Sequence, residues 1–494
     1  MRNSKLLVAI GAALVLASAL TPAFAARTDI TVGMVLEPPN LDPTAGAAAA
    51  IDEVVYANVF EGLTRFDSNG AIIPALAKSW DISADGLTYI FNLNSGVTFH
   101  DGTTMDAEDV KFSLERAMAE DSTNAQKALF ADIASVEARD ADTVVVTLSR
   151  PNGSFLFNMA WGDAVIVAPE SAADNATNPI GTGPFTFVDW AQGDKVELAR
   201  NENYWGNPVA LDKVTFKFIS DPTAAFAAMM AEDVDAFPNF PATETLPQFE
   251  ADARFKVIVG STEGETILST NNQSPPLDDV RVRQAIAHAI NRQAVIDGAM
   301  FGYGTPIGTH FNPTNPDYID LTGQSDYDPD KSRALLAEAG ITDLTLRLKP
   351  PPPTYARRGG EIIAAQLREV GINTEISNLE WAQWLEEVFR NKDYDLTIVS
   401  HTEPFDIGIY GRDDYYFNYD SPEFREIMAE LNDTTDPAGR TALLQKAQKF
   451  IADEYVNGYI FQLAKTGVAN AKINGLWENS PTQANDMTGV SWSD

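Results

Sequence analysis

Alternating apolar and polar positions predict half-buried strands in the first third of the chain. Asp29–Val35 alternates in this way, and so do Tyr89–Leu93 and Thr143–Leu148. Between the last two, Asp106 is suited to cap a helix that starts at Ala107, because acidic side chains fill its first turn. Strands and helices therefore mix early in the chain.

A second pattern has helical spacing. Apolar residues recur on one face between Val280 and Ala299, after a capping aspartate at 278 or 279. The spacing predicts one continuous helix over 280–299, and Gly298 and Gly302 are its expected stop signals.

In the region 340–410, segments with the alternation of a strand take turns with segments that have helical spacing. Strands are predicted at Leu344–Lys349, Ile372–Ser377 and Asp395–Ser400, and helices at Arg358–Val370 and Trp381–Asn391. This β-α-β-α-β order favours a parallel sheet with helical crossovers. In such sheets ligands bind beyond the carboxyl ends of the strands. Three loops share that edge: Pro350–Arg357, Asn378–Glu380 and His401–Asp406.

The first of these loops ends in Tyr355, Ala356, Arg357 and Arg358. Two adjacent guanidinium groups suit bidentate capture of a carboxylate or another oxyanion, and Tyr355 offers a ring face or a hydroxyl. The alternative is that the arginine pair only neutralises surrounding acids at a helix start.

The third loop brings His401, Glu403 and Asp406 to the same edge, where a cationic or polyhydroxyl ligand could meet them. A solvated acidic loop is the alternative. On the second crossover helix, Trp381 and Trp384 lie three residues apart. We expect one to floor the cleft and at least one to be buried in the core.

The N-terminal 25 residues have the features of an export signal. Arg2 and Lys5 precede the apolar run Leu6–Leu20, and Ala23–Ala25 supplies a small-x-small cleavage site. No cysteine follows, so we expect a cleaved signal, no lipid anchor and a periplasmic mature chain. An uncleaved membrane anchor is the alternative.

Length and charge narrow the functional class. A chain of 494 residues is longer than a single hydrophobic core usually supports, so at least two lobes are expected. The absence of cysteine excludes disulfides and thiolate chemistry. A net charge of −35 disfavours nucleic-acid and anionic-membrane partners, although it identifies no cationic ligand.

The sequence has no Gly-x-Ser-x-Gly motif of a serine hydrolase, no His-Glu-x-x-His motif of a zinc protease and no P-loop lysine signature. The four histidines, His100, His288, His310 and His401, show no ligand spacing, so neither a metal site nor a cofactor is predicted. A hydrolase that uses paired carboxylates stays open as a rival, and so does a chaperone-like or sensor protein that binds unfolded chains.

Seven segments together resemble the periplasmic dipeptide/oligopeptide-binding proteins of ABC importers, solute-binding protein family 5. They follow the family's order along nearly the whole mature chain: Phe60–Thr64, Ile73–Trp80, Val97–Thr103, Ala107–Ser113, Gly181–Phe185, Asn201–Gly206 and Pro276–Ile286.

The resemblance implies a two-lobed α/β periplasmic-binding-protein fold, type II and cluster C-like, which closes on one solute and presents it to permease subunits. Lobe I would comprise residues 26–270 and 466–494, with an extra subdomain inserted at about 60–180, and lobe II residues 271–465. The protein would be a monomeric receptor and not an enzyme.

The same resemblance suggests ligand contacts. Arg357 or Arg358 would hold a ligand carboxylate, and the position that binds the ligand ammonium in peptide receptors is Ser400 here. Because Ser400 lacks a charge, Glu403 or Asp406 would have to replace it, or the solute is an opine-like compound, an oligosaccharide or a metal chelate. Small residues at Gly46 and Ala47 match a segment that lines the pocket in relatives.

Overall fold

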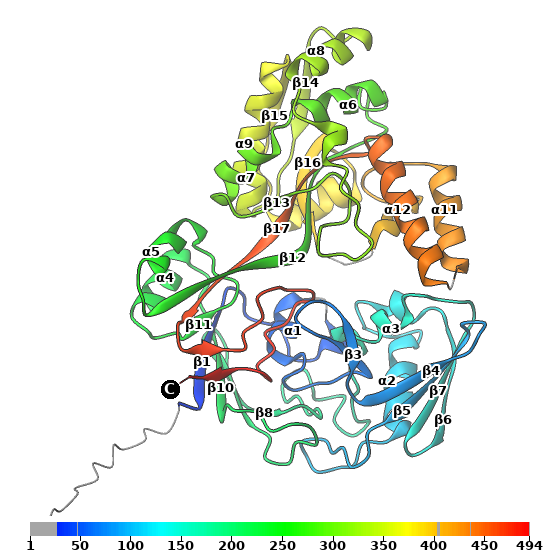
Figure 1. Ribbon diagram of the computed structural model, residues 1–494, viewed down its shortest axis with the longest axis vertical. Coiled ribbons are helices and arrows are strands. Elements are labelled where there is room, and N and C mark those ends of the chain that lie inside the picture. Colours follow the sequence, from blue (N-terminus) through cyan, green and yellow to red (C-terminus); the bar gives the residue numbers. More distant parts are fainter. Residues whose placement is uncertain (1–26, 47, 403–405, 435, 494) are drawn as a thin grey trace, which may run out of the picture.

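The computed structural model describes residues 27–46, 48–402, 406–434 and 436–493. The chain forms two lobes, drawn one above the other in Figure 1. The two longest strands, β12 (Phe255–Thr270) and β17 (Asn457–Asn470), run antiparallel from one lobe into the other. No helix in the described ranges is long and apolar enough to cross a membrane. The predicted export signal lies outside those ranges.

One sheet of eleven strands passes through both lobes. Its order is β15-β14-β16-β12-β17-β11-β1-β10-β9-β8, and β13 pairs with β17. The strands β12 and β17 are its centre, so the two lobes share a continuous hydrogen-bonded ladder. The other strands are β1 (Asp29–Met34), β8 (Phe185–Ala191), β9 (Lys195–Arg200), β10 (Lys213–Phe218), β11 (Ala236–Phe237), β13 (Thr305–Pro306), β14 (Leu344–Leu348), β15 (Ile372–Ile376) and β16 (Leu396–His401).

The parallel arrangement predicted for 340–410 is confirmed. β14 pairs in parallel with β15 along its whole length and with β16 through Leu348 and Leu396. The carboxyl ends of all three strands therefore reach the same edge, and that edge faces the lower lobe.

A separate four-stranded antiparallel sheet stands at the right of the lower lobe (Figure 1). The helix α2 (Ala107–Met118) packs on it, and the predicted cap is present, since Asp106 accepts a hydrogen bond from the amide of Glu108. In the two strands that the alternation predicted, Tyr89, Phe91 and Leu93 are buried, and so are Val144, Val146 and Leu148. The strand order of the sheet is β4 (Ala77–Ile82), β5 (Thr88–Leu93), β7 (Thr143–Leu148) and β6 (Ile133–Asp140). Two short strand pairs complete the lower lobe, β2 (Thr64–Phe66) with β3 (Ile72–Pro74) and β18 (Ile473–Asn474) with β19 (Ser491–Trp492).

The single helix predicted over 280–299 is wrong. Two helices occupy the region, α6 (Val280–Ala289) and α7 (Arg292–Met300). Ile290 is extended, and Asn291 caps a new helix by accepting from the amide of Ala294 at 3.0 Å. The cap outweighs the continuous apolar pattern.

The predicted stop at Gly298 is also wrong, because this residue lies inside α7. A Cβ there would come within 2.5 Å of Ile362, so glycine permits close packing on the helix α9 (Thr354–Glu369). The chain leaves α7 through Phe301 and Gly302, both with positive φ.

The helix α9 (Thr354–Glu369) begins earlier than predicted. Pro353 is its N-cap, so Tyr355 and Arg357 occupy the first turn rather than a loop, and Arg358 follows that turn instead of starting the helix. The second crossover helix starts as α10 (Trp381–Trp384) and continues as a π-helical turn over Leu385–Arg390. The remaining helices are α1 (Ala49–Val55), α3 (Phe155–Asn158), α4 (Pro222–Met230), α5 (Leu246–Glu250), α8 (Pro329–Glu338), α11 (Pro422–Asp433) and α12 (Pro437–Asp453).

Candidate functional site

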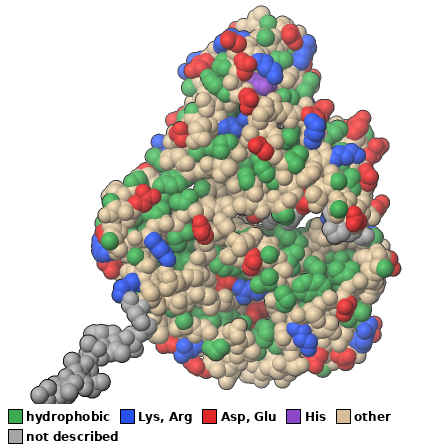
Figure 2. All heavy atoms as spheres, viewed as in Figure 1, with side chains coloured by type: hydrophobic (Ala, Val, Ile, Leu, Met, Phe, Trp, Pro, Cys, Tyr) green, Lys and Arg blue, Asp and Glu red, His purple; other side chains and the backbone are tan. Residues whose placement is uncertain are grey.

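A cavity of about 460 Å³ lies between the lobes, beside β12 and β17, which we call the crossing strands. The lower lobe contributes Ala49, Glu53 and Trp161 to its wall, and the upper lobe contributes Met300, Tyr355 and Thr402. Thr262, Glu263 and Lys465 come from β12 and β17 themselves. Figure 2 shows the surface hollowed between the lobes. A movement of one lobe against the other would therefore change this cavity directly.

Lys465 is the buried cation of the cavity. Its ammonium group donates hydrogen bonds to the carbonyl oxygens of Trp477 at 2.9 Å and Asn479 at 3.4 Å. Burial lowers its pKa to about 8. An ammonium group has three N–H donors, so one remains for a ligand.

Two carboxyl groups line the same cavity. Glu53 accepts from the Asn239 amide at 3.2 Å, and burial raises its pKa to about 7. Glu263 accepts from the side chains of Asn312 and Thr314, both at 3.5 Å, and burial raises its pKa as well. The cavity thus offers one cation and two potential anions, which suits a ligand that carries both signs of charge.

A second cavity of about 910 Å³ opens farther out, between the four-stranded sheet and the helices α11 and α12. Arg440 of α12 crosses it and donates to Ser154 of the lower lobe at 3.4 Å. A Cβ on Gly153 would lie 2.4 Å from the Arg440 Cζ, so glycine lets the guanidinium lie against the backbone. Although this cavity is larger, the smaller one holds the buried ammonium of Lys465 and is in direct contact with the crossing strands. We therefore take the smaller one as the solute site.

Among the predicted residues, Tyr355 lines the solute cavity. Its hydroxyl accepts a hydrogen bond from the backbone amide of Ser400 at 3.2 Å and so ties α9 to the end of β16. The Ser400 hydroxyl is buried and has no hydrogen-bond partner among the described residues.

The arginine pair lies apart from the cavity wall. Arg357 donates to the carbonyl of Leu379 at 3.0 Å and to Glu380 at 2.9 Å. The Arg358 guanidinium lies 4.7 Å from the centre of the Phe301 ring. Both contacts are within the upper lobe.

Of the two expectations for the tryptophans, burial of one ring in the core is met, but no tryptophan of this helix lies at the floor of the cavity. Trp384 is buried and donates to Thr397 at 2.9 Å, whereas Trp381 is 44% exposed and packs edge-to-face on Trp384. Neither ring belongs to the described wall of the solute cavity.

Gly46 is closely packed, since a Cβ would lie 2.8 Å from Ile51 and 3.0 Å from the Asn40 amide. The cavity wall begins slightly later in the chain, at Ala49. Ala47 and Glu403 lie outside the described residues.

His401 and Asp406 come together with a histidine that the sequence did not link to them. Asp406 lies between His401 (Nδ1 to Oδ2, 3.4 Å) and His310 (Nε2 to Oδ1, 2.6 Å). Burial would raise the pKa of Asp406, but the two imidazoles hold it well below its usual range.

Sequence reasoning missed the charged cavity residues Glu53, Glu263 and Lys465. They are far apart in the chain, and the tertiary fold alone brings them together. The sequence contains one clue to Lys465, because this lysine lies in the otherwise largely apolar strand β17.

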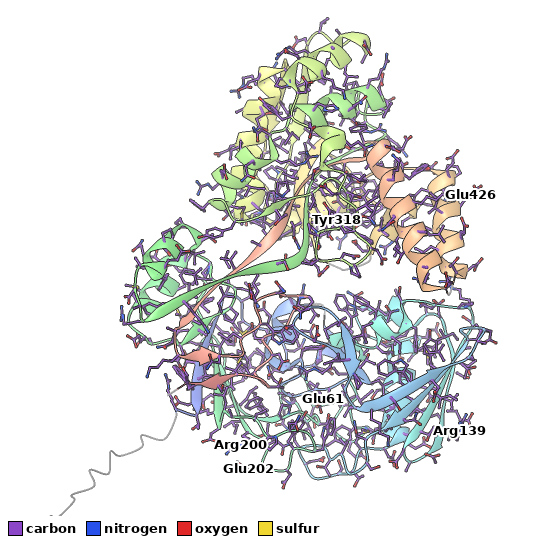
Figure 3. All side chains as sticks on the ribbon, in the orientation of Figure 1. Glu61, Arg139, Arg200, Glu202, Tyr318 and Glu426 are labelled. Carbon is purple, nitrogen blue, oxygen red and sulfur yellow. The ribbon has the colours of Figure 1, made fainter. Side chains whose placement is uncertain are left out.

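Three of the segments that carry the family resemblance meet at the buried carboxylate of Glu61, which Figure 3 labels in the lower lobe. Glu61 accepts hydrogen bonds from Thr182 at 2.8 Å, Tyr204 at 2.8 Å and Trp205 at 2.9 Å. Burial raises the pKa of this carboxyl. These motif residues hold the lower lobe together and do not line the solute cavity.

Comparison with known proteins agrees with this architecture. A family model described as bacterial extracellular solute-binding proteins, family 5 Middle, matches residues 71–425. The glutathione-binding protein GsiB of Pectobacterium atrosepticum is 32% identical over 388 residues, which cover 77% of this chain and 74% of that protein.

Solved structures match over nearly the whole chain. The Helicobacter pylori protein DppA in complex with peptide STSA has a TM-score of 0.82 at 24% identity and covers 95% of this chain and 99% of its own. AgaA in complex with agropinic acid, from A. tumefaciens R10, has a TM-score of 0.79 at 23% identity and covers 94% and 99%. The predicted α/β periplasmic-binding-protein fold of cluster C is confirmed.

Proposed function

Because this chain belongs to family 5 of the bacterial extracellular solute-binding proteins, whose members are non-catalytic transport receptors, we propose that it captures a peptide-like zwitterion for an ABC importer. The observation that carries this proposal is the mixed charge of the solute cavity. One buried ammonium and two carboxyl groups line it, and these are the counter-charges that a free peptide needs at its two ends.

Each end of the ligand has a proposed partner. Lys465 would hold the carboxylate through its remaining N–H donor, and Glu53 or Glu263 would hold the ammonium. This assignment supplies the negative charge that Ser400 lacks. The arginine pair, His401, Glu403 and Asp406 stay as alternative contacts that would require the upper lobe to move toward the ligand.

The ligands of similar proteins support both this proposal and its main alternative. GsiB is a glutathione-binding protein, and the DppA structure holds a peptide, whereas AgaA holds agropinic acid. An opine-like compound is therefore the second candidate, and an oligosaccharide of the same receptor class is the third. A carboxylate-dependent hydrolase is less favoured, because the membership in family 5 implies release of an unchanged solute.

Closure would occur about the crossing strands. We assign residues 26–270 and 466–494 to lobe I, with the inserted subdomain at about 60–180, and residues 271–465 to lobe II. The contact of Arg440 with Ser154 would form part of the closed interface. Such hinge motion buries the solute and presents a joint surface of both lobes to the permease.

The proposal of export rests on the features of the N-terminal segment. We propose cleavage after Ala25, a free periplasmic chain without a lipid anchor, and action as a monomer beside the permease subunits. The net charge of −35 supports the exclusion of nucleic acid as a partner.

Native mass spectrometry of protein purified without refolding tests the ligand class. A peptide or amino-acid conjugate should leave with the chain in a one-to-one complex. Calorimetry with a dipeptide library, agropinic acid and an oligosaccharide set then ranks the three candidates. Recovery of a cleaved compound, or the absence of any one-to-one complex across all three sets, would contradict the receptor proposal.

The pH dependence of binding should be bell-shaped. An ammonium ligand needs ionised Glu53, whose pKa is about 7, so dipeptide affinity should rise about tenfold per pH unit from pH 5 toward 7. Lys465, with a pKa of about 8, loses its charge above that value, and affinity should fall again. Calorimetry from pH 5 to 9 measures the profile. Glu53→Gln should flatten only the acid limb, and an unchanged acid limb in this variant would remove Glu53 from the assignment.

A further inference from the structure

A second polar site lies inside the upper lobe, behind the wall of the solute cavity. His310, His401 and Asp406 face one another within a core of tyrosine, phenylalanine and aliphatic side chains. The side chain of His310 is 0% exposed and that of His401 8%. The proposed solute mechanism uses none of the three as its main contact, so the cluster needs its own explanation.

The ligand atoms of these residues converge. One ring nitrogen of His310, one ring nitrogen of His401 and an Asp406 oxygen all lie within 4.8 Å of one another. Four ligands around a tetrahedral ion with bonds of about 2.0–2.1 Å are separated by about 3.3 Å. The 3.4 Å contact of His401 with Asp406 already has that spacing, and the 2.6 Å contact of His310 has to open by only about 0.7 Å.

The outward nitrogens have fixed partners. His310 Nδ1 lies 3.1 Å from the Tyr410 hydroxyl, and His401 Nε2 lies 3.0 Å from the Tyr416 hydroxyl. An imidazole that binds a metal through one nitrogen donates its other N–H to an oxygen acceptor. The Tyr416 hydroxyl can accept in that way. The Tyr410 hydroxyl already accepts from Asn457 at 3.1 Å and from Tyr459 at 3.3 Å, so it would have to exchange one of these donors for His310. The ring orientations are therefore set by groups outside the cluster.

One more carboxyl group lies beside the cluster, outside the three residues whose ligand atoms converge within 4.8 Å. Glu265 lies opposite His401 in the pairing of β12 with β16 and is 3% exposed. Its Oε1 accepts from the Asn312 amide at 3.1 Å, whereas its Oε2 is buried with no hydrogen-bond partner among the described residues. A buried carboxyl oxygen without a partner is costly unless something binds it.

We propose that His310, His401 and Asp406, with Glu265 as fourth ligand, bind one divalent transition-metal ion of the class of Zn²⁺, Ni²⁺ and Co²⁺. Two imidazoles and two carboxylates match the ligand preference of that class. The charges balance as well, because two carboxylates compensate one divalent cation in an interior where an isolated charge is expensive. The chain has no cysteine, so the site would contain only nitrogen and oxygen ligands.

The position of the site gives it a structural consequence for solute binding. Thr402, next to His401, and Glu263, two residues before Glu265, line the solute cavity. Ile407 and Gly408, next to Asp406, line the larger outer cavity, and the Asp406 side chain keeps 14% of its surface exposed, which gives an ion a route inward. A bound ion would join β12, β16 and the segment of His310, and so stiffen the upper wall of the solute cavity.

Equilibrium dialysis of the full exported chain, carrying no polyhistidine tag and stripped with chelator, tests the proposal with Zn²⁺, Ni²⁺ and Co²⁺. One equivalent per chain is expected. The Co²⁺ form should absorb in the visible with tetrahedral intensity, and X-ray absorption of the Zn²⁺ form should count two imidazoles. Less than about a tenth of an equivalent for all three ions, or a shell without imidazole, would overturn the proposal.

Variants separate this site from surface binding. His310→Gln and Asp406→Asn should bind at least about tenfold more weakly, and Tyr410→Phe about tenfold more weakly through lost orientation of His310. His288→Gln is the matched control, because His288 is also buried in the upper lobe but contacts only the Asp326 carbonyl, at 2.8 Å, among the hydrogen bonds of described residues. Wild-type affinity in both His310→Gln and Asp406→Asn would overturn the assignment. If these variants fail to fold by circular dichroism, the imidazole count on the wild-type protein decides.

Discussion

Replacing Lys465 with methionine is expected to weaken binding of a dipeptide by about 30-fold or more, because removing one partner of a buried charge pair costs about 2–5 kcal/mol. Methionine keeps the length and the apolar stem of the side chain but has no charge to offer a carboxylate. Calorimetry with the tightest dipeptide of the library gives the ratio of dissociation constants. The size of the effect follows from burial, since Lys465 is only 3% exposed.

Lys256→Met is the matched control for this experiment. Lys256 lies on β12, and its ammonium donates to the backbone carbonyl of Ile473, outside the described wall of the solute cavity. Its replacement should leave the affinity within about twofold, since surface changes away from a site usually stay within about 0.5 kcal/mol. Circular dichroism of both variants checks that they fold.

The arginine pair provides the outcome that would contradict the assignment of Lys465. If Arg357→Ala or Arg358→Ala abolishes dipeptide binding while Lys465→Met retains it, the carboxylate is held by the pair. In that case the contacts of Arg357 with Leu379 and Glu380 would have to break when the lobes close on the ligand.

Replacing Glu61 with alanine is expected to lower the free energy of unfolding by about 3 kcal/mol, because one buried donor and two half-buried donors lose their acceptor at about 1–3 kcal/mol each. The donors come from Thr182, Tyr204 and Trp205, so the loss would loosen two segments of the lower lobe at once. Chemical denaturation monitored by tryptophan fluorescence measures the change.

Glu202→Ala is the control for Glu61→Ala. Figure 3 labels Glu202 beside Arg200, and its side chain is 75% exposed with one ion pair at 3.0 Å. Exposed pairs contribute at most about 1 kcal/mol, so this variant should keep nearly the wild-type stability. Equal losses in the two variants would mean that the Glu61 hydrogen bonds do not stabilise the lobe.

The two predictions with large effects separate the family motifs from the ligand contacts. The motif at Phe60–Thr64 contributes Glu61, and the motif at Asn201–Gly206 contributes Tyr204 and Trp205, so their shared role is to hold the lower lobe. Lys465 and Glu53 line the cavity and belong to none of the segments that carry the resemblance. Under the proposed assignment, the residues that mark the family differ from the residues that would select the solute.

Local patterns predicted elements well where one signal dominated. The alternation at Thr143–Leu148 and the cap at Asp106 gave the correct strand and helix, because neighbouring residues alone decide them. The prediction failed over 280–299, where a helical apolar stripe competed with a cap at Asn291. It also began α9 four residues late, because the helix starts directly after Pro353.

The parallel direction of β14, β15 and β16, the class of the fold and the absence of thiol chemistry could all be inferred from the amino-acid sequence, since periodicity, motif order and composition are local or additive properties. Which charged groups share one cavity depends on the tertiary fold. Glu53, Glu263 and Lys465 meet at one cavity, and His310 meets His401 and Asp406, because the crossing strands and the loops beside them bring distant segments together. Periodicity records which side of an element is buried, but it holds no information on which distant side chain lies opposite.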